Sequence, residues 1–119
     1  MEDELVINVK EFLGTDYPQG RTSEDGSPSA ETLRQHIVAN WDKYRKISIS
    51  LESIVKMTRT FVDEAFAKIM EDHTVEEFNE KIFFPDAKEA QVQELNQAFK
   101  LRLKIISTQR EREKDELSL

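Results

Sequence analysis

The sequence of 119 residues contains no cysteine and only three glycines. The absence of cysteine excludes disulfides, thiolate nucleophiles and cysteine metal sites, and it fits a reducing compartment. The chain also lacks both glycine-rich motifs, G-x-G-x-x-G and G-x-x-x-x-G-K-[ST], so a glycine loop that binds a dinucleotide or a triphosphate is not expected. The two histidines, His36 and His73, lie in different predicted elements and outside any H-E-x-x-H pattern. We therefore expect no metal and no cofactor.

Long apolar runs and an excess of basic residues are missing as well. No run approaches the roughly 20 residues that cross a bilayer, and the opening MEDELVINVK lacks the order of a secretion signal, basic and then apolar. We expect a cytoplasmic protein with no membrane contact. The net charge of −7, from 17 basic and 24 acidic residues, argues against nucleic acid as the main partner. Proteins or small molecules are the expected partners.

The chain does contain three segments that are typical of β-strands. Apolar residues alternate with polar ones in ELVINVKEFLG, residues 4–14, and again in KISISL, residues 46–51. A short apolar run, Ile82–Phe84, precedes Pro85 and predicts a third, buried strand. Residues 14–29 hold all three glycines and two of the three prolines, which indicates a long loop.

Three other segments show helical periodicity. Ser27 or Ser29 is placed to cap a helix of about residues 28–43. Apolar residues at helical spacing predict a second helix over residues 60–70, and a third begins near Ala87.

The alternation of strands and helices predicts an α/β fold, with a small mixed or mostly parallel sheet and about three to four helices. The length fits one domain with an independent core, which we place at residues 1–106. Residues 107–119 carry charge of both signs and little apolar material, so they are expected to form a solvated helix end or tail.

A first polar group lies before and within the first helix and contains Arg21, Asp25, Ser29 and Arg34. Turn chemistry is one interpretation, because Asp25 followed by glycine is a common turn dipeptide and Ser29 suits a helix cap. The other is a recognition site, in which the arginines and the free amides of the helix start hold an anionic group. The residue types are compatible with both.

A second polar group marks the start of the second helix. Thr60, followed three residues later by Asp63, matches the capping pattern [ST]-x-x-[DE], and capping alone would explain it. The position also follows a central strand, where open α/β sheets place their sites. A phosphate on Thr60 would add about two negative charges beside Asp63 and Glu64, which would make a binding switch.

These motifs resemble those of the STAS-like domain family of bacteria, short proteins of unsettled function, over about residues 6–103. The family pattern of G-R, D-G and S-G-E-x-[FL]-R is similar to GR at residues 20–21, DG at 25–26 and SAETLR at 29–34. The family's second pattern, S-F-[LV]-D-E-A-F, is more specific and is similar to TFVDEAF at residues 60–66. The resemblance implies a STAS-like fold.

The resemblance also implies a switch. In the STAS domains of anti-sigma factor antagonists, a serine or threonine at the start of the helix after a central strand is phosphorylated by a histidine-kinase-like ATPase. Thr60 is then the implied phosphoacceptor, with Thr58 as second choice, and such an ATPase is an implied partner. Three positions depart from the patterns: Ala30 replaces a glycine, Thr60 replaces a serine and keeps the hydroxyl, and the bulky Phe61 stands where the antagonists have a glycine.

Two hypotheses follow for the function. The first is a non-enzymatic, regulatory protein-interaction module that binds a protein partner through the helix start near Thr60 and the loop before Pro28. The second is a sensor in which Arg21, Arg34 and Arg59 converge on a small anionic ligand. An enzyme is least favoured, because no nucleophile has an evident base. Exposed strand edges would allow the protein to form a homodimer. The expected partner or ligand contacts are Arg21, Asp25, Ser29, Arg34, Arg59, Asp63 and Glu64.

Overall fold

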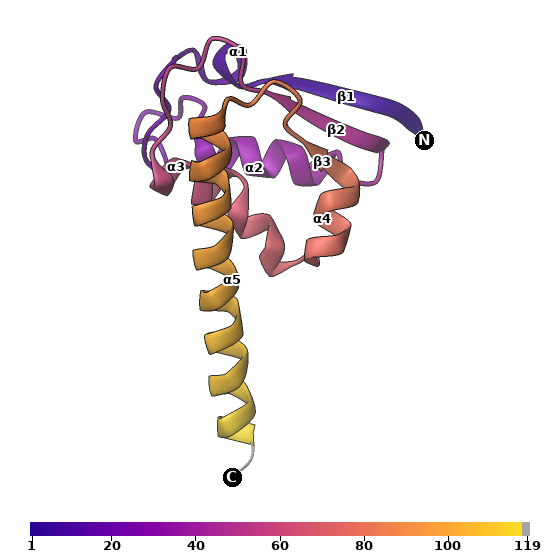
Figure 1. Cartoon of the computed structure of the whole chain (residues 1–119), viewed down its shortest axis with the longest axis vertical. Coiled ribbons are helices and arrows are strands. Elements are labelled where there is room, and N and C mark those ends of the chain that lie inside the picture. Colours follow the sequence, from indigo (N-terminus) through magenta and orange to yellow (C-terminus); the bar gives the residue numbers. More distant parts are fainter. Residues whose placement is uncertain (118–119) are drawn as a thin grey trace.

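The computed structural model describes residues 1–117, and Figure 1 shows how the elements are arranged. The chain begins with β1 (Glu2–Asn8), α1 (Val9–Leu13), α2 (Ala30–Ala39) and β2 (Tyr44–Ser50). It continues with α3 (Arg59–Ala65), the 3-10 helix η1 (Ala67–Glu71), α4 (Val75–Lys81), β3 (Ile82–Phe83) and α5 (Glu89–Leu117).

The three strands form one parallel sheet in the order β1-β2-β3, which confirms the predicted α/β class. Ile47 in the central strand pairs with Leu5 of β1 and with Ile82 of β3. These three side chains share one face of the sheet and pack into the hydrophobic core. Val6 and Lys46 lie on the other face and are exposed. The helical layer therefore covers one face of the sheet.

The segment after β1 is helical, so the prediction of a strand over residues 4–14 is wrong for its second half. The strand ends at Asn8, whose side-chain oxygen accepts a hydrogen bond from the Glu11 N–H at 2.9 Å and caps α1. Gly14 ends this helix with a φ of 72°, in the left-handed region that glycine adopts without strain. The cap at Asn8 therefore starts a helix where the alternation of apolar and polar residues predicted a longer strand.

The helix predicted over residues 60–70 is divided into α3 and η1, which meet at Phe66. All residues from 61 to 67 are buried, whereas one amphipathic helix would expose one side. The Phe66 ring packs edge-on against Phe61 and Phe84, with centroids 5.9 and 5.2 Å apart. The break lets consecutive side chains enter the core between α2 and α5.

Helix α4 was not predicted, although the sequence contains its start signal. Thr74 and Glu77 form a capping box, with the Glu77 N–H donating to Thr74 Oγ1 at 3.1 Å and the Thr74 N–H to Glu77 Oε1 at 3.0 Å. Together with α1, this helix raises the number of α-helices in residues 1–117 to five, above the three to four expected. The strand predicted over Ile82–Phe84 is confirmed as the two-residue β3, although only Ile82 is buried and Phe83 is exposed.

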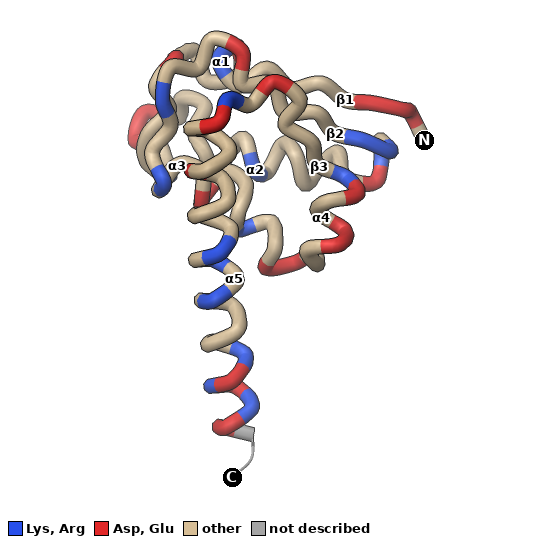
Figure 2. Tube along the Cα trace, in the orientation of Figure 1, with Lys and Arg blue, Asp and Glu red and all other residues tan. Residues whose placement is uncertain are grey.

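The last helix, α5, packs on α3 and η1 through a stripe that includes Leu95, Ala98 and Ile106. Residues 107–116 are all exposed, and this part projects from the body of the protein (Figure 1). Positive and negative residues alternate along it (Figure 2). The segment predicted as a solvated end is therefore helical up to residue 117.

Ending the chain after Thr108 tests whether the domain is complete at residue 106. Residues 109–116 are exposed, so we expect the free energy of unfolding to change by less than about 0.5 kcal/mol. The buried Ile106 offers a contrast, because Ile106→Ala should lower it by about 2 kcal/mol or more. Urea denaturation measures both. A loss above about 1 kcal/mol in the shortened chain would place part of the folding unit beyond residue 106.

Candidate functional site

The long loop after α1 lies against the loop that joins β2 to α3. The Val55 N–H donates to the Asp16 carbonyl at 2.8 Å, and the Thr58 N–H donates to the Pro18 carbonyl at 3.3 Å. The second loop follows the carboxyl end of β2 directly, and the first follows β1 after the short helix α1, so both lie on the side of the sheet at which open α/β sheets place their sites. The two polar groups found in the sequence are thus brought together.

Helix α3 is capped by Thr58 and not, as predicted, by Thr60. The Thr58 hydroxyl accepts a hydrogen bond from the Phe61 N–H at 3.1 Å, and the helix begins at Arg59. Thr60 is the second helical residue and is exposed. The hydroxyl of Thr60 forms no hydrogen bond within the part of the chain that the structure describes. One threonine therefore holds the helix start, and the other faces solvent.

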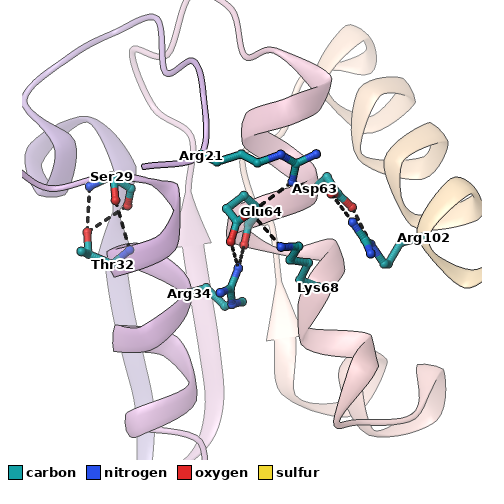
Figure 3. Close-up of polar contacts among 8 residues, drawn as sticks. All are labelled: Arg21, Ser29, Thr32, Arg34, Asp63, Glu64, Lys68 and Arg102. Carbon is teal, nitrogen blue, oxygen red and sulfur yellow. Dashed lines mark hydrogen bonds and ion pairs between the residues drawn. The ribbon is translucent and has the colours of Figure 1, made fainter. Parts of the chain in front are cut away.

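Two acidic residues of α3, Asp63 and Glu64, lie inside an ionic cluster (Figure 3). Asp63 is 8% exposed and accepts two hydrogen bonds from Arg102 of α5, Nε to Oδ1 at 2.8 Å and Nη2 to Oδ2 at 2.5 Å. Arg21, from the long loop, places Nη1 at 2.8 Å from Asp63 Oδ2 and 3.1 Å from Glu64 Oε1. Asp63 therefore links α3 to α5 and to the long loop.

Glu64 extends the same cluster toward α2 and η1. It is 3% exposed, and its Oε2 accepts a hydrogen bond from Arg34 Nη1, which also donates to the Glu64 carbonyl at 2.5 Å. The Lys68 ammonium lies 3.0 Å from Oε1. Figure 3 shows these cations approaching the carboxylate from α2 and from η1. One side chain thus joins three helical elements.

Four cations surround these two carboxylates and control their ionisation. Burial would raise the pKa of Glu64, but the hydrogen bonds from Arg34, Lys68 and Arg21 outweigh it and lower the pKa to about 2. The same competition, between burial and the hydrogen bonds from two arginines, lowers the pKa of Asp63. Both groups are ionised at neutral pH.

Arg59, the third arginine of the predicted site, binds side chains of α5 instead of joining the cluster. Its Nε donates to Glu94 Oε1 at 3.0 Å, and its Nη2 donates to the Gln97 side-chain oxygen. Both acceptors belong to α5. The structure does not bring Arg59 together with Arg21 and Arg34, which meet at a carboxylate of the chain itself.

Asp25 and Ser29 act in local backbone structure. Asp25 Oδ1 accepts hydrogen bonds from the Ser27 N–H at 3.0 Å and hydroxyl at 2.6 Å, and these bonds lower the pKa of Asp25. Ser29, not Ser27, caps α2, because its hydroxyl accepts the Thr32 N–H at 3.3 Å while Thr32 Oγ1 accepts the Ser29 N–H at 2.7 Å (Figure 3). Roles in partner or ligand contact stay predictions for all seven residues.

Two members of the cluster, Lys68 and Arg102, were missed in the sequence, although each carried a signal. Lys68 follows Glu64 by four residues, the spacing at which opposite charges meet along a helix. Arg102 falls in register with the buried Ala98 and Ile106 of α5. A charged residue in an apolar stripe needs a buried partner of opposite charge.

Acid should weaken the fold through Glu64. Its pKa is about 2 in the folded protein and about 4.5 in the unfolded chain, so its stabilisation is present above pH 4.5 and is lost as the pH falls toward 2. Between pH 6 and pH 2.5 we expect Glu64 to contribute a loss of about 2 kcal/mol in the free energy of unfolding. Denaturant titrations across this range should show a shallower loss in Glu64→Gln than in the exposed control Glu76→Gln. Equal pH dependence in the two variants would contradict this assignment.

The two threonines should differ in their contribution to stability. Thr58→Ala removes the cap of α3 and is expected to lower the free energy of unfolding by about 1 kcal/mol. Thr60→Ala removes an exposed hydroxyl without a partner in the described residues, so a change within about 0.5 kcal/mol is expected. Urea denaturation of both variants measures this difference. The reverse order would return the cap to Thr60.

Neither a metal cluster nor a membrane-spanning helix is found among the described residues. Within residues 1–117, no three histidine, cysteine, aspartate or glutamate side chains are grouped so as to hold a metal ion. None of the described helices combines the length and apolar composition that crossing a bilayer requires.

Comparison with known proteins places the chain in a family. No curated protein and no solved structure matches the chain. A family model described as a STAS-like domain of unknown function matches residues 29–92, more than half of the chain, and the protein therefore belongs to the STAS-like domain family.

Proposed function

We propose that this STAS-like domain is a non-enzymatic regulatory module that binds a protein partner at the start of α3. The partner surface consists of Arg59, Thr60 and the loop of residues 24–28, all of them exposed. Modification of Thr60 modulates the interaction. The observation that carries the proposal is the separation of roles between Thr58, which caps the helix, and Thr60, whose hydroxyl faces solvent.

This separation makes a modification of Thr60 compatible with the fold. A phosphate on Thr58 would disturb the hydrogen bond to the Phe61 N–H. A phosphate on Thr60 would leave that bond in place and add about two negative charges to an exposed surface. The carboxylates of Asp63 and Glu64, beside which the phosphate would lie in sequence, are buried and paired with cations. The altered charge is therefore available to a partner.

The ionic cluster holds the loop of the proposed partner surface in place. Arg21 is bonded to Asp63 and Glu64 and so fixes the loop that leads to residues 24–28 against α3. The Glu31 N–H donates to the Arg21 carbonyl at 3.0 Å, which joins the same point of the loop to α2. A loop held at both ends loses little conformational entropy when a partner binds.

The kind of partner is suggested by the resemblance to STAS domains. A histidine-kinase-like ATPase that phosphorylates Thr60 is the candidate, and Phe61, where the antagonists have a glycine, is buried and 1% exposed. The bulk of Phe61 therefore points into the core and leaves the surface beside Thr60 open. This supports Thr60 as an acceptor that a kinase can reach.

Affinity capture of the tagged protein from its native cells, with mass spectrometry of the peptide containing Thr58 and Thr60, identifies partners and locates phosphate. The captured partner is then titrated with the parent chain, Thr60→Glu and Thr60→Ala. We expect Thr60→Glu to change the affinity by about tenfold, a difference of about 1.4 kcal/mol. Thr108→Glu, which places the same charge on the exposed part of α5, is the matched control and should not change it. Equal affinities for all four proteins would refute the proposal.

A further inference from the structure

A cavity with a volume of about 480 Å³ opens between α2 and η1. Arg34 and Val38 line it from α2, and Lys68, Asp72 and His73 line it from η1 and the residues that follow. Its size lies in the range of small-molecule sites, about 300 to 1,000 Å³. The cavity lies beyond the carboxyl end of α3, whereas the proposed partner surface lies at the start of that helix.

One end of the cavity is cationic. Arg34 and Lys68 both contact the Glu64 carboxylate, so their charged groups are neighbours (Figure 3). Arg21 contacts the same carboxylate and also Asp63, so with Arg102 the cluster holds four cations against two carboxylates. Within residues 1–117, the Arg34 side chain donates only through Nη1 and the Lys68 ammonium only to Glu64. Further N–H groups on both remain for a ligand, and the side chains are 21% and 29% exposed.

The other end of the cavity is acidic. Asp72 lies four residues after Lys68, and Val38 lies one helical turn after Arg34. Rises of about 2.0 Å per residue in a 3-10 helix and 1.5 Å in an α-helix separate the α-carbons of Lys68 and Asp72 by about 8 Å, and those of Arg34 and Val38 by about 6 Å, along the helix axes. The Asp72 carboxylate is exposed and has no hydrogen bond or ion pair among the described residues. Glu71 also lines the cavity and adds to its negative charge.

An apolar surface separates the two charged ends. Val38 is 44% exposed, and Ile69, which also lines the cavity, is buried beneath it. His73 closes the wall, because its ring is stacked on Trp41 with centroids 3.9 Å apart. The cavity therefore presents donors, then apolar surface, then acceptors along its length.

We propose that this cavity binds a zwitterion of dipeptide size. The ligand carboxylate lies at Arg34 and Lys68, where the planar guanidinium suits a carboxylate. The ligand ammonium lies at Asp72, and an apolar ligand side chain contacts Val38. Two extended residues span about 7 Å, which is comparable with the axial spacing of Lys68 and Asp72. A simple anion would meet the repulsion of Asp72, and a simple cation that of Arg34, so the mixed lining selects a ligand with both charges.

A titration of the isotopically labelled protein with the dipeptide glycyl-leucine, followed by NMR, tests the site. We expect saturable shifts confined to residues of α2 and η1. N-acetyl-glycyl-leucine lacks the ammonium and glycyl-leucinamide lacks the carboxylate, so each should bind about tenfold more weakly, the value of one charge-assisted hydrogen bond. Shifts that do not saturate, or that fall outside the cavity, would overturn the proposal. So would equal binding of all three peptides.

A variant of the acidic end locates the ammonium contact. Asp72→Asn removes an exposed charge without a partner in residues 1–117, and the fold should not change. It should weaken glycyl-leucine about fivefold or more and leave N-acetyl-glycyl-leucine unaffected, because that peptide has no ammonium to lose. Asp42→Asn makes the same chemical change outside the cavity and should leave both affinities unaltered. An equal effect of Asp72→Asn on the two peptides would overturn the placement of the ammonium.

The two proposals can fail separately. The cavity variants leave Thr60 and Arg59 in place, and Thr60→Glu leaves the lining of the cavity in place. Glycyl-leucine should therefore bind Thr60→Glu and the parent equally. A tenfold difference between these two proteins would contradict the assignment of two independent sites.

Discussion

Two adjacent carboxylates, Asp63 and Glu64, determine how the parts of this protein meet. Neighbouring residues of a helix point about 100° apart, so the two side chains leave α3 in different directions. Asp63 reaches Arg102 on α5, and Glu64 reaches Arg34 on α2 and Lys68 on η1. The order of two acids along one turn thus fixes the positions of three neighbouring elements.

The cluster also explains part of the family motif. Arg21, Arg34, Asp63 and Glu64 all fall in the motifs by which the chain resembles the STAS-like family, and in the structure they bind one another. Removing one partner from such a buried group leaves an uncompensated charge, whereas an apolar replacement of the whole group is often tolerated. The motif residues therefore describe how this domain is assembled, and Thr60 beside them is exposed.

Local signals in the sequence were sufficient for the α/β class, and they narrowed the cap of α2 to Ser27 or Ser29 and the sheet to a mixed or mostly parallel one. They were also present for the helix starts at Asn8 and Thr74, but the apolar patterns of residues 4–14 and of Ile82–Phe84 drew attention to strands instead. The cluster could not be found in this way, because Arg21 and Glu64 are 43 residues apart and no periodicity connects them. Asp63 and Glu64 were expected at an exposed binding surface, because acidic side chains are more often solvated than buried, but both are buried.

The exposed part of α5 gives the molecule a rigid extension. Residues 107–116 continue the helix with exposed side chains, and ten residues at 1.5 Å each measure about 15 Å. Each residue along it also turns the helix by about 100°. Anything that binds near the end is held at a set distance and a set angle from the sheet. A single inserted residue would change that distance little and rotate the attached body by more than a quarter of a circle.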